Sequence, residues 1–179
     1  METVKQKENK AYATLKGRYG YKNVMAAPRF KKVVISVGTG SGVKRNKDLN
    51  KFVSDRLAKI TGQKPAPRSA KKSVASFKIR IGDPVGIMVT LRGARMYGFL
   101  DKLINLAIPR TKDFRGIDRK IVDDIGNLTM SVKEHTIFPE TADEDIKDIF
   151  GLGITLVTSA RNKAEATDFF ELIGFPFKK

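Results

Sequence analysis

Cysteine is absent from this chain of 179 residues, and histidine occurs once, as His135. The lack of cysteine excludes disulfide bonds, thiolate zinc sites and a catalytic cysteine. A single histidine without a patterned acidic cluster is a poor metal ligand, so we expect His135 to be a hydrogen-bonded structural residue. We therefore predict neither a metal site nor a cofactor.

Motifs for catalysis and for membrane spanning are also missing. The chain has no Gly-x-Ser-x-Gly, no His-Glu-x-x-His and no P-loop. No apolar run approaches the roughly 20 residues that cross a bilayer, and residues 1–10 lack the apolar core of a signal peptide. We expect a soluble, intracellular protein without enzymatic activity, bound to no membrane and to no small-molecule substrate.

Two short clusters have the composition of a nucleotide-binding loop and of a calcium loop, but their residue spacing matches neither. Gly38–Gly42 matches neither glycine pattern of nucleotide-binding loops, so we expect a tight turn there that brings the backbone close to RNA or to another element. The acidic residues between Glu140 and Asp148 lack the spacing of a calcium loop. They are more typical of a solvated helix start.

Acidic residues are scarce in the first two-thirds of the chain. Residues 1–120 contain 29 basic and 8 acidic side chains, whereas residues 121–179 contain 6 and 11. The whole chain has a net charge of +16 and a pI near 10.1. A compact fold with this imbalance repels itself unless a polyanion offsets the charge. Because an enzyme cleft for an acidic substrate needs only a few cations, the distribution favours a large polyanion.

Strand and helix patterns interleave along the chain. We expect a basic helix over 1–20, helices over 47–61 (N-cap Asn46), 94–107 (ended by Pro109) and 162–173, and strands over 30–37, 86–92, 128–133 and 153–159. This order predicts an α+β sandwich with a mainly antiparallel sheet, helices packed on one face and RNA on the other. Residues 1–179 are predicted to form a single RNA-binding domain.

The most basic stretch lies between residues 63 and 82 and has no acidic residue. Its cations are Lys64, Arg68, Lys71, Lys72, Lys78 and Arg80. Pro65 and Pro67 limit strand pairing, so we expect a long extended loop over 70–82. Phosphate is the natural partner of such a loop.

A second extended loop is predicted over 109–127, with Arg110, Lys112 and Arg115 around one aromatic, Phe114. Stacking on a base, docking on a partner protein and tucking back onto the domain would each explain the Phe.

Several segments, in order, resemble one known family. They are Tyr21-Lys-Asn-Val-Met25, Thr61-Gly-Gln-Lys-Pro65, Ala70-Lys-Lys-Ser73, Val89-Thr-Leu-Arg-Gly93, Phe99-Leu-Asp-Lys-Leu103, Pro109-Arg-Thr-Lys-Asp-Phe-Arg-Gly116, Gly126-Asn127, Ile137-Phe-Pro-Glu140 and Phe175-Pro-Phe-Lys-Lys179. Together they resemble the bacterial large-subunit ribosomal protein L5 family over nearly the whole chain.

The resemblance implies a structural protein of the central protuberance that binds 5S rRNA and helps attach it to the large subunit. The implied partners are 5S rRNA, large-subunit rRNA, P-site tRNA and other ribosomal proteins, including a small-subunit head protein at an intersubunit bridge. It assigns 5S rRNA binding to Lys32, Ser36, Gln63, Lys64, Phe77, Thr90 and Arg92. It assigns the tRNA-contacting loop to Arg68, Lys71, Lys72, Ser73, Lys78 and Arg80, and a bridge or rRNA loop to Arg110, Lys112, Phe114 and Arg115.

The chain departs from the family pattern at two places. Ser36 stands where the family often has Asn, so a bidentate contact is lost. Val122–Leu128 replaces a run that in the family often contains Arg and Tyr.

The alternative function is a general RNA-binding or RNA-chaperone domain that acts off the ribosome.

Overall fold

The computed structural model describes residues 2–40, 48–112, 114–141 and 149–178. The chain forms two compact units, which are described one at a time. The first consists of Met1–Val33, Arg92–Met130 and Thr155–Lys179, and the second of Val34–Leu91 and Ser131–Ile154. The single RNA-binding domain expected for residues 1–179 stays a prediction.

The described strands form one open antiparallel sheet in the order β2-β3-β1-β5-β4, which confirms the α+β class. The strands are β1 (Phe30–Gly38), β2 (Ala66–Ser69), β3 (Pro84–Leu91), β4 (Leu128–Val132) and β5 (Leu152–Thr158). The α-helices are α1 (Val4–Tyr19), α2 (Leu49–Thr61), α3 (Gly93–Lys102), α4 (Ile108–Arg110) and α5 (Lys163–Ile173). Short turns of helix connect them.

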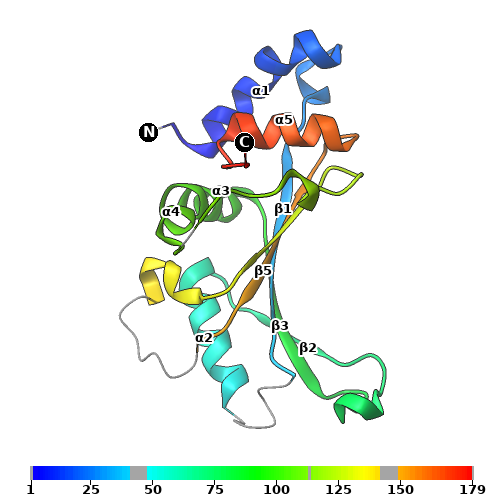
Figure 1. The fold of residues 1–179 in the computed structure, drawn as a ribbon, viewed down its shortest axis with the longest axis vertical. Coiled ribbons are helices and arrows are strands. Elements are labelled where there is room, and N and C mark those ends of the chain that lie inside the picture. Colours follow the sequence, from blue (N-terminus) through cyan, green and yellow to red (C-terminus); the bar gives the residue numbers. More distant parts are fainter. Residues whose placement is uncertain (1, 41–47, 113, 142–148, 179) are drawn as a thin grey trace. The chain divides into compact units, whose positions relative to one another are not determined.

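Helices α1 and α5 of the first unit lie side by side (Figure 1). The start of α1 is also tied to α3, because the Val4 amide donates to Asp101 Oδ1 at 2.7 Å. Lys7 Nζ donates to the Ile173 carbonyl at the end of α5, at 2.8 Å. Val4, Ala11 and Leu15 form the buried apolar stripe of this helix.

Two buried carboxylates bind the first unit together from inside. Glu8 accepts from the Phe30 amide at 3.0 Å and from the Tyr97 hydroxyl at 2.8 Å. Glu165 accepts from the Tyr21 hydroxyl at 2.6 Å and from the Arg161 amide at 2.7 Å. Burial, with the adjacent carboxylate, raises the pKa of Tyr97 to about 12 and raises that of Tyr21 as well. Both tyrosines therefore remain donors at neutral pH.

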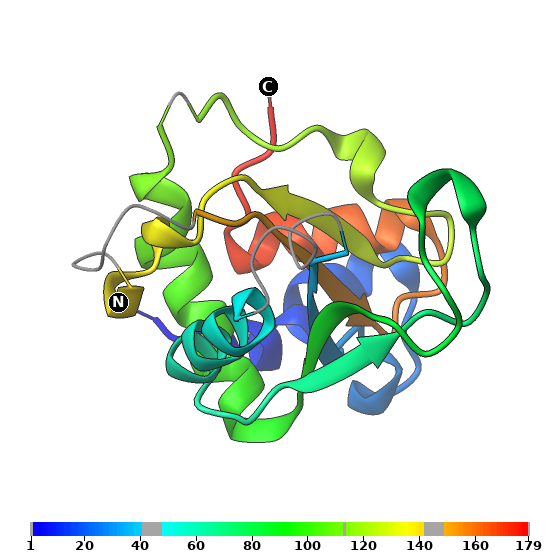
Figure 2. The ribbon, with the colours of Figure 1, turned by 90° about the horizontal axis from the view of Figure 1, so that it is seen from below.

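Helix α2 of the second unit packs on β3, whose residues alternate between its two faces. Ile87, Val89 and Leu91 are buried, while Met88 and Thr90 on the other face are half-buried. β2 pairs with β3 in antiparallel register, with Ala66 opposite Met88 and an irregularity between Arg68 and Ser69. Figure 2 shows the two strands side by side and the loop that joins them.

His135 belongs to the second unit and is buried, with only 4% of its surface exposed. It begins the short helical turn His135–Ile137, which is followed by another, Pro139–Thr141. Its ring stacks on Phe150 at 4.1 Å between centroids and meets the Phe52 ring edge-on. Its Nδ1 accepts from the Phe150 amide at 3.4 Å. The predicted hydrogen-bonded structural role of His135 is confirmed.

Glycine ends three of the helices, whereas Pro109 does not end the helix over 94–107 as expected from the sequence. Gly20, Gly62 and Gly174 all adopt positive φ at the C-caps. The helix over 94–107 instead passes through a π-turn at Leu103–Ala107 and continues to Arg110, with Pro109 in the first turn of α4. The π-turn shifts the backbone hydrogen bonds directly before the proline, where the Ile108 amide donates to the Leu103 carbonyl. Asn46 and the acidic residues 143–148 lie outside the described residues.

The Tyr21–Glu165 hydrogen bond should contribute to the stability of the first unit. Tyr21→Phe removes one donor from a buried carboxylate, and we expect it to lower the free energy of unfolding by about 1–3 kcal/mol. Tyr12→Phe, which alters a half-buried tyrosine on α1, is the matched control and should change it by less than about 0.5 kcal/mol. Urea denaturation followed by circular dichroism measures both. Equal effects of the two substitutions would contradict the role of Glu165.

His135 should make the stability of the second unit depend on pH. Burial, followed by the nearby Arg56 guanidinium, lowers the pKa of His135 below 6.5. The folded chain then binds fewer protons than the unfolded chain near pH 6, so stability is full above about pH 6.5 and falls as the pH decreases. His135→Phe keeps an aromatic ring against Phe150 but cannot titrate. Urea denaturation at about pH 7.5 and about pH 5.5 should show a smaller loss for the variant than for wild type; an equal loss would assign the pH dependence to other groups.

Candidate nucleic-acid interface

The face of the sheet opposite α2 presents polar side chains in the second unit. On β1, Val33, Ile35 and Val37 are buried, and Ser36 between them is exposed. Thr90 on β3 points to the same side as half-buried Met88, away from the Ile87–Leu91 core face. A Cβ on Gly153 of β5 would lie only 3.2 Å from Ser36 Oγ, so the glycine leaves this hydroxyl accessible.

Gln63 is positioned by the end of α2. Gly62 turns the chain with φ +65°, and Gln63 then reaches β3, where its Nε2 donates to the Thr90 carbonyl at 3.2 Å. Gln63 and Thr90 are therefore brought together, as expected for two members of one binding surface. Lys64 follows directly and is exposed.

Lys32 and Arg92 belong to the first unit and adjoin these strands along the chain. Lys32 is half-buried on β1, four residues before Ser36 along the chain. Arg92 is exposed directly after β3, as the N-cap residue of α3.

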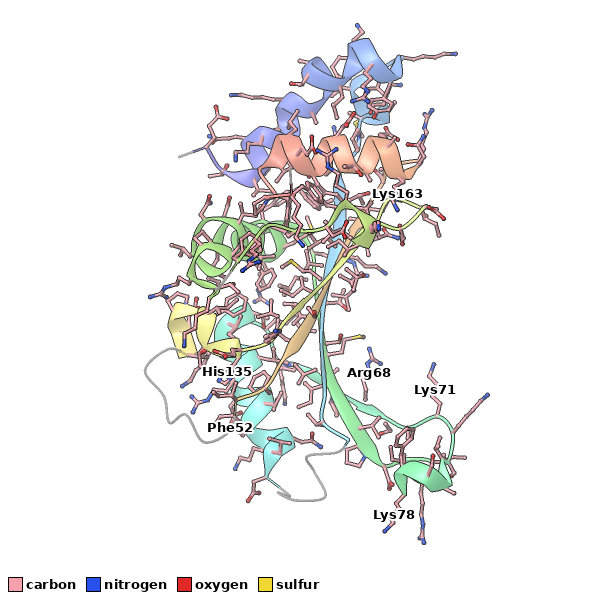
Figure 3. The ribbon with its side chains drawn as sticks, viewed as in Figure 1. Phe52, Arg68, Lys71, Lys78, His135 and Lys163 are labelled. Carbon is pink, nitrogen blue, oxygen red and sulfur yellow. The ribbon has the colours of Figure 1, made fainter. Side chains whose placement is uncertain are left out.

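The basic loop over 70–82 is an ordered extension of the β2–β3 hairpin. Val74 and Ile79 form an antiparallel bridge around the helical turn Ala75–Phe77, and the Ile81 amide donates to Ser73 Oγ at 3.1 Å. Asp83 is the acidic residue closest to the loop in sequence, and its carboxylate accepts from the Arg80 amide at 2.8 Å. The loop's cations are exposed, and Lys71 and Lys78 project from the tip in different directions (Figure 3).

Phe77 lies on this hairpin tip and not on a strand beside Thr90. It is 68% exposed and precedes Lys78, which adopts a left-handed conformation with φ +53°. Ile81 is 70% exposed and Val74 is also exposed on the same hairpin. Sequence reasoning did not select these two apolar residues, although the alternation Phe-Lys-Ile-Arg-Ile over 77–81 was a usable signal.

The C-terminal segment anchors the loop over 109–127 in the first unit. The Ile117 amide donates to the Pro176 carbonyl at 2.8 Å, and the Lys178 amide donates back to the Ile117 carbonyl at 2.9 Å. Gly116, with φ +90°, passes so close to Lys178 that an added Cβ would meet its backbone at 3.0 Å. Immediately before this anchor, Arg110, Lys112, Phe114 and Arg115 are all exposed.

Phe114 is 37% exposed, so it does not tuck fully onto the domain. Stacking on a base and docking on a partner protein both remain open for it.

In the described ranges, no three His, Asp or Glu side chains converge as metal ligands. No described helix combines the length and apolar character needed to cross a membrane.

Comparison with known families matches two consecutive parts of the chain. Residues 23–80 match the family model described as ribosomal protein L5, and residues 84–177 match the model described as the C-terminus of the same ribosomal family. The matched ranges contain every described strand, residues 70–80 of the basic hairpin and the loop over 109–127.

Close relatives extend the similarity to almost the full length. The large ribosomal subunit protein uL5 of Heliobacterium modesticaldum is 48% identical over 93% of this chain and 92% of its own. Those of Desulforamulus reducens and Thermotoga sp. strain RQ2 are 46% and 45% identical, over 96% and 97% of this chain and 94% of each relative. The chain therefore belongs to the ribosomal protein L5 family, whose members are structural, non-enzymatic proteins of the cytoplasmic ribosome.

Proposed function

We propose that this protein is a structural component of the large ribosomal subunit that binds 5S rRNA and helps attach it in the central protuberance. The observation that carries the proposal is the polar sheet face, on which Gln63 is held against Thr90. Two further groups, Ser36 and Lys64, are exposed in the same unit. Hydrogen-bonding groups fixed on rigid strands can read the shape of a folded RNA, while the flanking cations neutralise its phosphates.

The basic hairpin is the proposed contact with P-site tRNA. Its internal bridge and turn give it a defined shape, while its cations stay exposed. The carboxylate of Asp83 is engaged by a backbone amide, which favours pairing of the loop's cations with an external anion. Because the hairpin extends beyond the paired strands, its cations can contact the phosphate backbone of an RNA that lies at some distance from the sheet. Phe77 at the tip adds a surface for stacking on a base or sugar.

The exposed group Arg110, Lys112, Phe114 and Arg115 is the proposed contact with large-subunit rRNA or with a small-subunit head protein. The Ile117 hydrogen bonds to the C-terminal segment hold the chain directly after this group. An anchored loop loses less conformational entropy on binding than a free one. Its cations can pair with RNA phosphates, and its aromatic ring can stack on a base or pack against a protein.

Sedimentation of a cell lysate through sucrose separates this proposal from a general RNA chaperone. A ribosomal component should remain with the large subunits at high salt, because specific contacts add to the salt-sensitive phosphate contacts. A protein held only by charge should move to the top of the gradient. Recovery of the protein at the top alone would favour the chaperone function.

Gln63→Ala should weaken 5S rRNA binding by about 1–3 kcal/mol, because it removes an oriented amide from the interface. Asn105→Ala, at an exposed amide outside the proposed surfaces, is the control and should leave the affinity unchanged. Filter binding of purified protein to 5S rRNA measures both. No loss for Gln63→Ala would remove this residue from the site.

Lys71→Ala combined with Lys72→Ala should weaken tRNA contact more than 5S rRNA binding, since both lysines lie on the hairpin extension. Each lost phosphate contact should also reduce the salt slope of tRNA binding by about 0.7–0.9. The double variant of exposed Lys51 and Lys133 to Ala has the same charge change and serves as the control. A collapse of 5S rRNA affinity alone would show that the loop is wrongly assigned.

A further inference from the structure

Thr61 is the last residue of α2, and its side chain is buried in the second unit. Only 6% of its surface is exposed. Its hydroxyl carries a single proton and lies 2.6 Å from the Leu57 carbonyl, one helical turn earlier, to which it donates. This short hydrogen bond fixes the hydroxyl oxygen against the end of the helix.

The fixed oxygen of Thr61 also contacts the chain that leaves the helix. The Gln63 amide donates to it at 3.4 Å, and the Gln63 carbonyl lies 3.2 Å from it. Gly62 between the two residues adopts the left-handed conformation, which turns the backbone back toward the helix end. One buried oxygen therefore links the end of α2 to the backbone N–H and C=O of Gln63.

The position of the Gln63 side chain depends on this link. Its Nε2 donates to the Thr90 carbonyl at 3.2 Å, and because a carbonyl only accepts, the amide nitrogen must face β3. A glutamine side chain has several rotatable bonds, so a hydrogen bond at its tip alone leaves it mobile. The contact with Thr61 holds the backbone end of Gln63, and the contact with Thr90 holds its amide.

Thr141 provides a comparison within the second unit, because its hydroxyl serves packing alone. This residue is completely buried, and its Oγ1 lies 3.0 Å from the His135 carbonyl and 3.2 Å from the Phe138 carbonyl. Neither contact reaches a residue of the proposed RNA surface. Thr61 resembles Thr141 in burial and in its carbonyl contact, and differs because its hydroxyl also reaches Gln63.

We propose that Thr61 is a positioning residue for 5S rRNA recognition. It is too buried to contact the RNA, and its hydroxyl acts by holding the backbone of Gln63 so that the Gln63 amide stays against Thr90 on the binding surface. This inference rests on the proposed function, because it takes Gln63 to bind 5S rRNA.

The first test compares Thr61→Val, which keeps the shape of the side chain but loses the hydroxyl, with Thr61→Ser, which keeps the hydroxyl. Filter binding of full-length protein to 5S rRNA should show a loss of about threefold to tenfold for Thr61→Val and a change within about twofold for Thr61→Ser. The salt slope of Thr61→Val should equal that of wild type, because no phosphate contact is removed.

Thr141→Val is the matched control for the loss of a buried hydroxyl. Urea denaturation should show that both valine variants are destabilised, because each leaves a buried carbonyl with one donor fewer. The 5S rRNA affinity of Thr141→Val should stay within about twofold of wild type at a temperature where circular dichroism shows all variants folded. An effect on folding alone would move both variants together.

A double-mutant cycle with Gln63→Ala separates positioning from general stabilisation. Once the Gln63 side chain is removed, Thr61→Val has no group left to position, so it should change 5S rRNA affinity by no more than about twofold in that background. A threonine that only stabilises the fold would give the same fold loss in both backgrounds.

Equal losses in both backgrounds, no recovery with Thr61→Ser, or unchanged affinity of Thr61→Val would each overturn the inference while leaving 5S rRNA binding itself in place. A wild-type protein that does not bind 5S rRNA would refute the proposed function, and the inference with it.

Discussion

The constraint on which this structure depends is like-charge repulsion among 35 basic side chains with only 19 acidic ones to offset them. Four of the acidic residues accept hydrogen bonds from backbone amides or tyrosine hydroxyls of the same chain. Glu8, Glu165 and Asp101 accept from backbone amides and tyrosine hydroxyls, and Asp83 accepts from the Arg80 amide. The same contacts that join α1, α3, β1 and α5 therefore leave the cations exposed. Folding concentrates positive charge on the surface, where a polyanion stabilises it.

Charge alone would bind any RNA, so the arrangement of the neutral polar groups matters as much. The β strands fix the spacing of Ser36 and Thr90, and the αL turn at Gly62 delivers Gln63 to the Thr90 carbonyl. Backbone hydrogen bonds likewise hold the hairpin extension, and they fix Ile117 directly after the exposed group Arg110, Lys112, Phe114 and Arg115. Because these groups are positioned before binding, the ordering entropy of association is smaller. Rigid strands carry the groups suited to specificity, and projecting segments carry the cations suited to phosphate.

Local signals were enough to predict much of this fold from the sequence. The glycines after α1, α2 and α5 marked helix ends because only glycine adopts the αL cap at low cost. The prediction that Pro109 ends the helix was wrong, because a π-turn precedes this proline and the helix continues to Arg110. Phe77, which the resemblance assigns to 5S rRNA binding, lies on the hairpin tip. The inward roles of Glu8 and Glu165 depend on partners 22 and 144 residues away, which no local pattern contains.

The central claim is that fixed polar groups on the sheet add specificity to binding by charge. A gel-shift titration of the purified protein with 5S rRNA, with excess tRNA as competitor and at two salt concentrations, tests it most directly. Tight binding to 5S rRNA that survives the competitor at the higher salt is the predicted result, because salt weakens phosphate contacts much more than hydrogen bonds to RNA. Binding that both competitor and salt abolish would contradict it and leave only the charge.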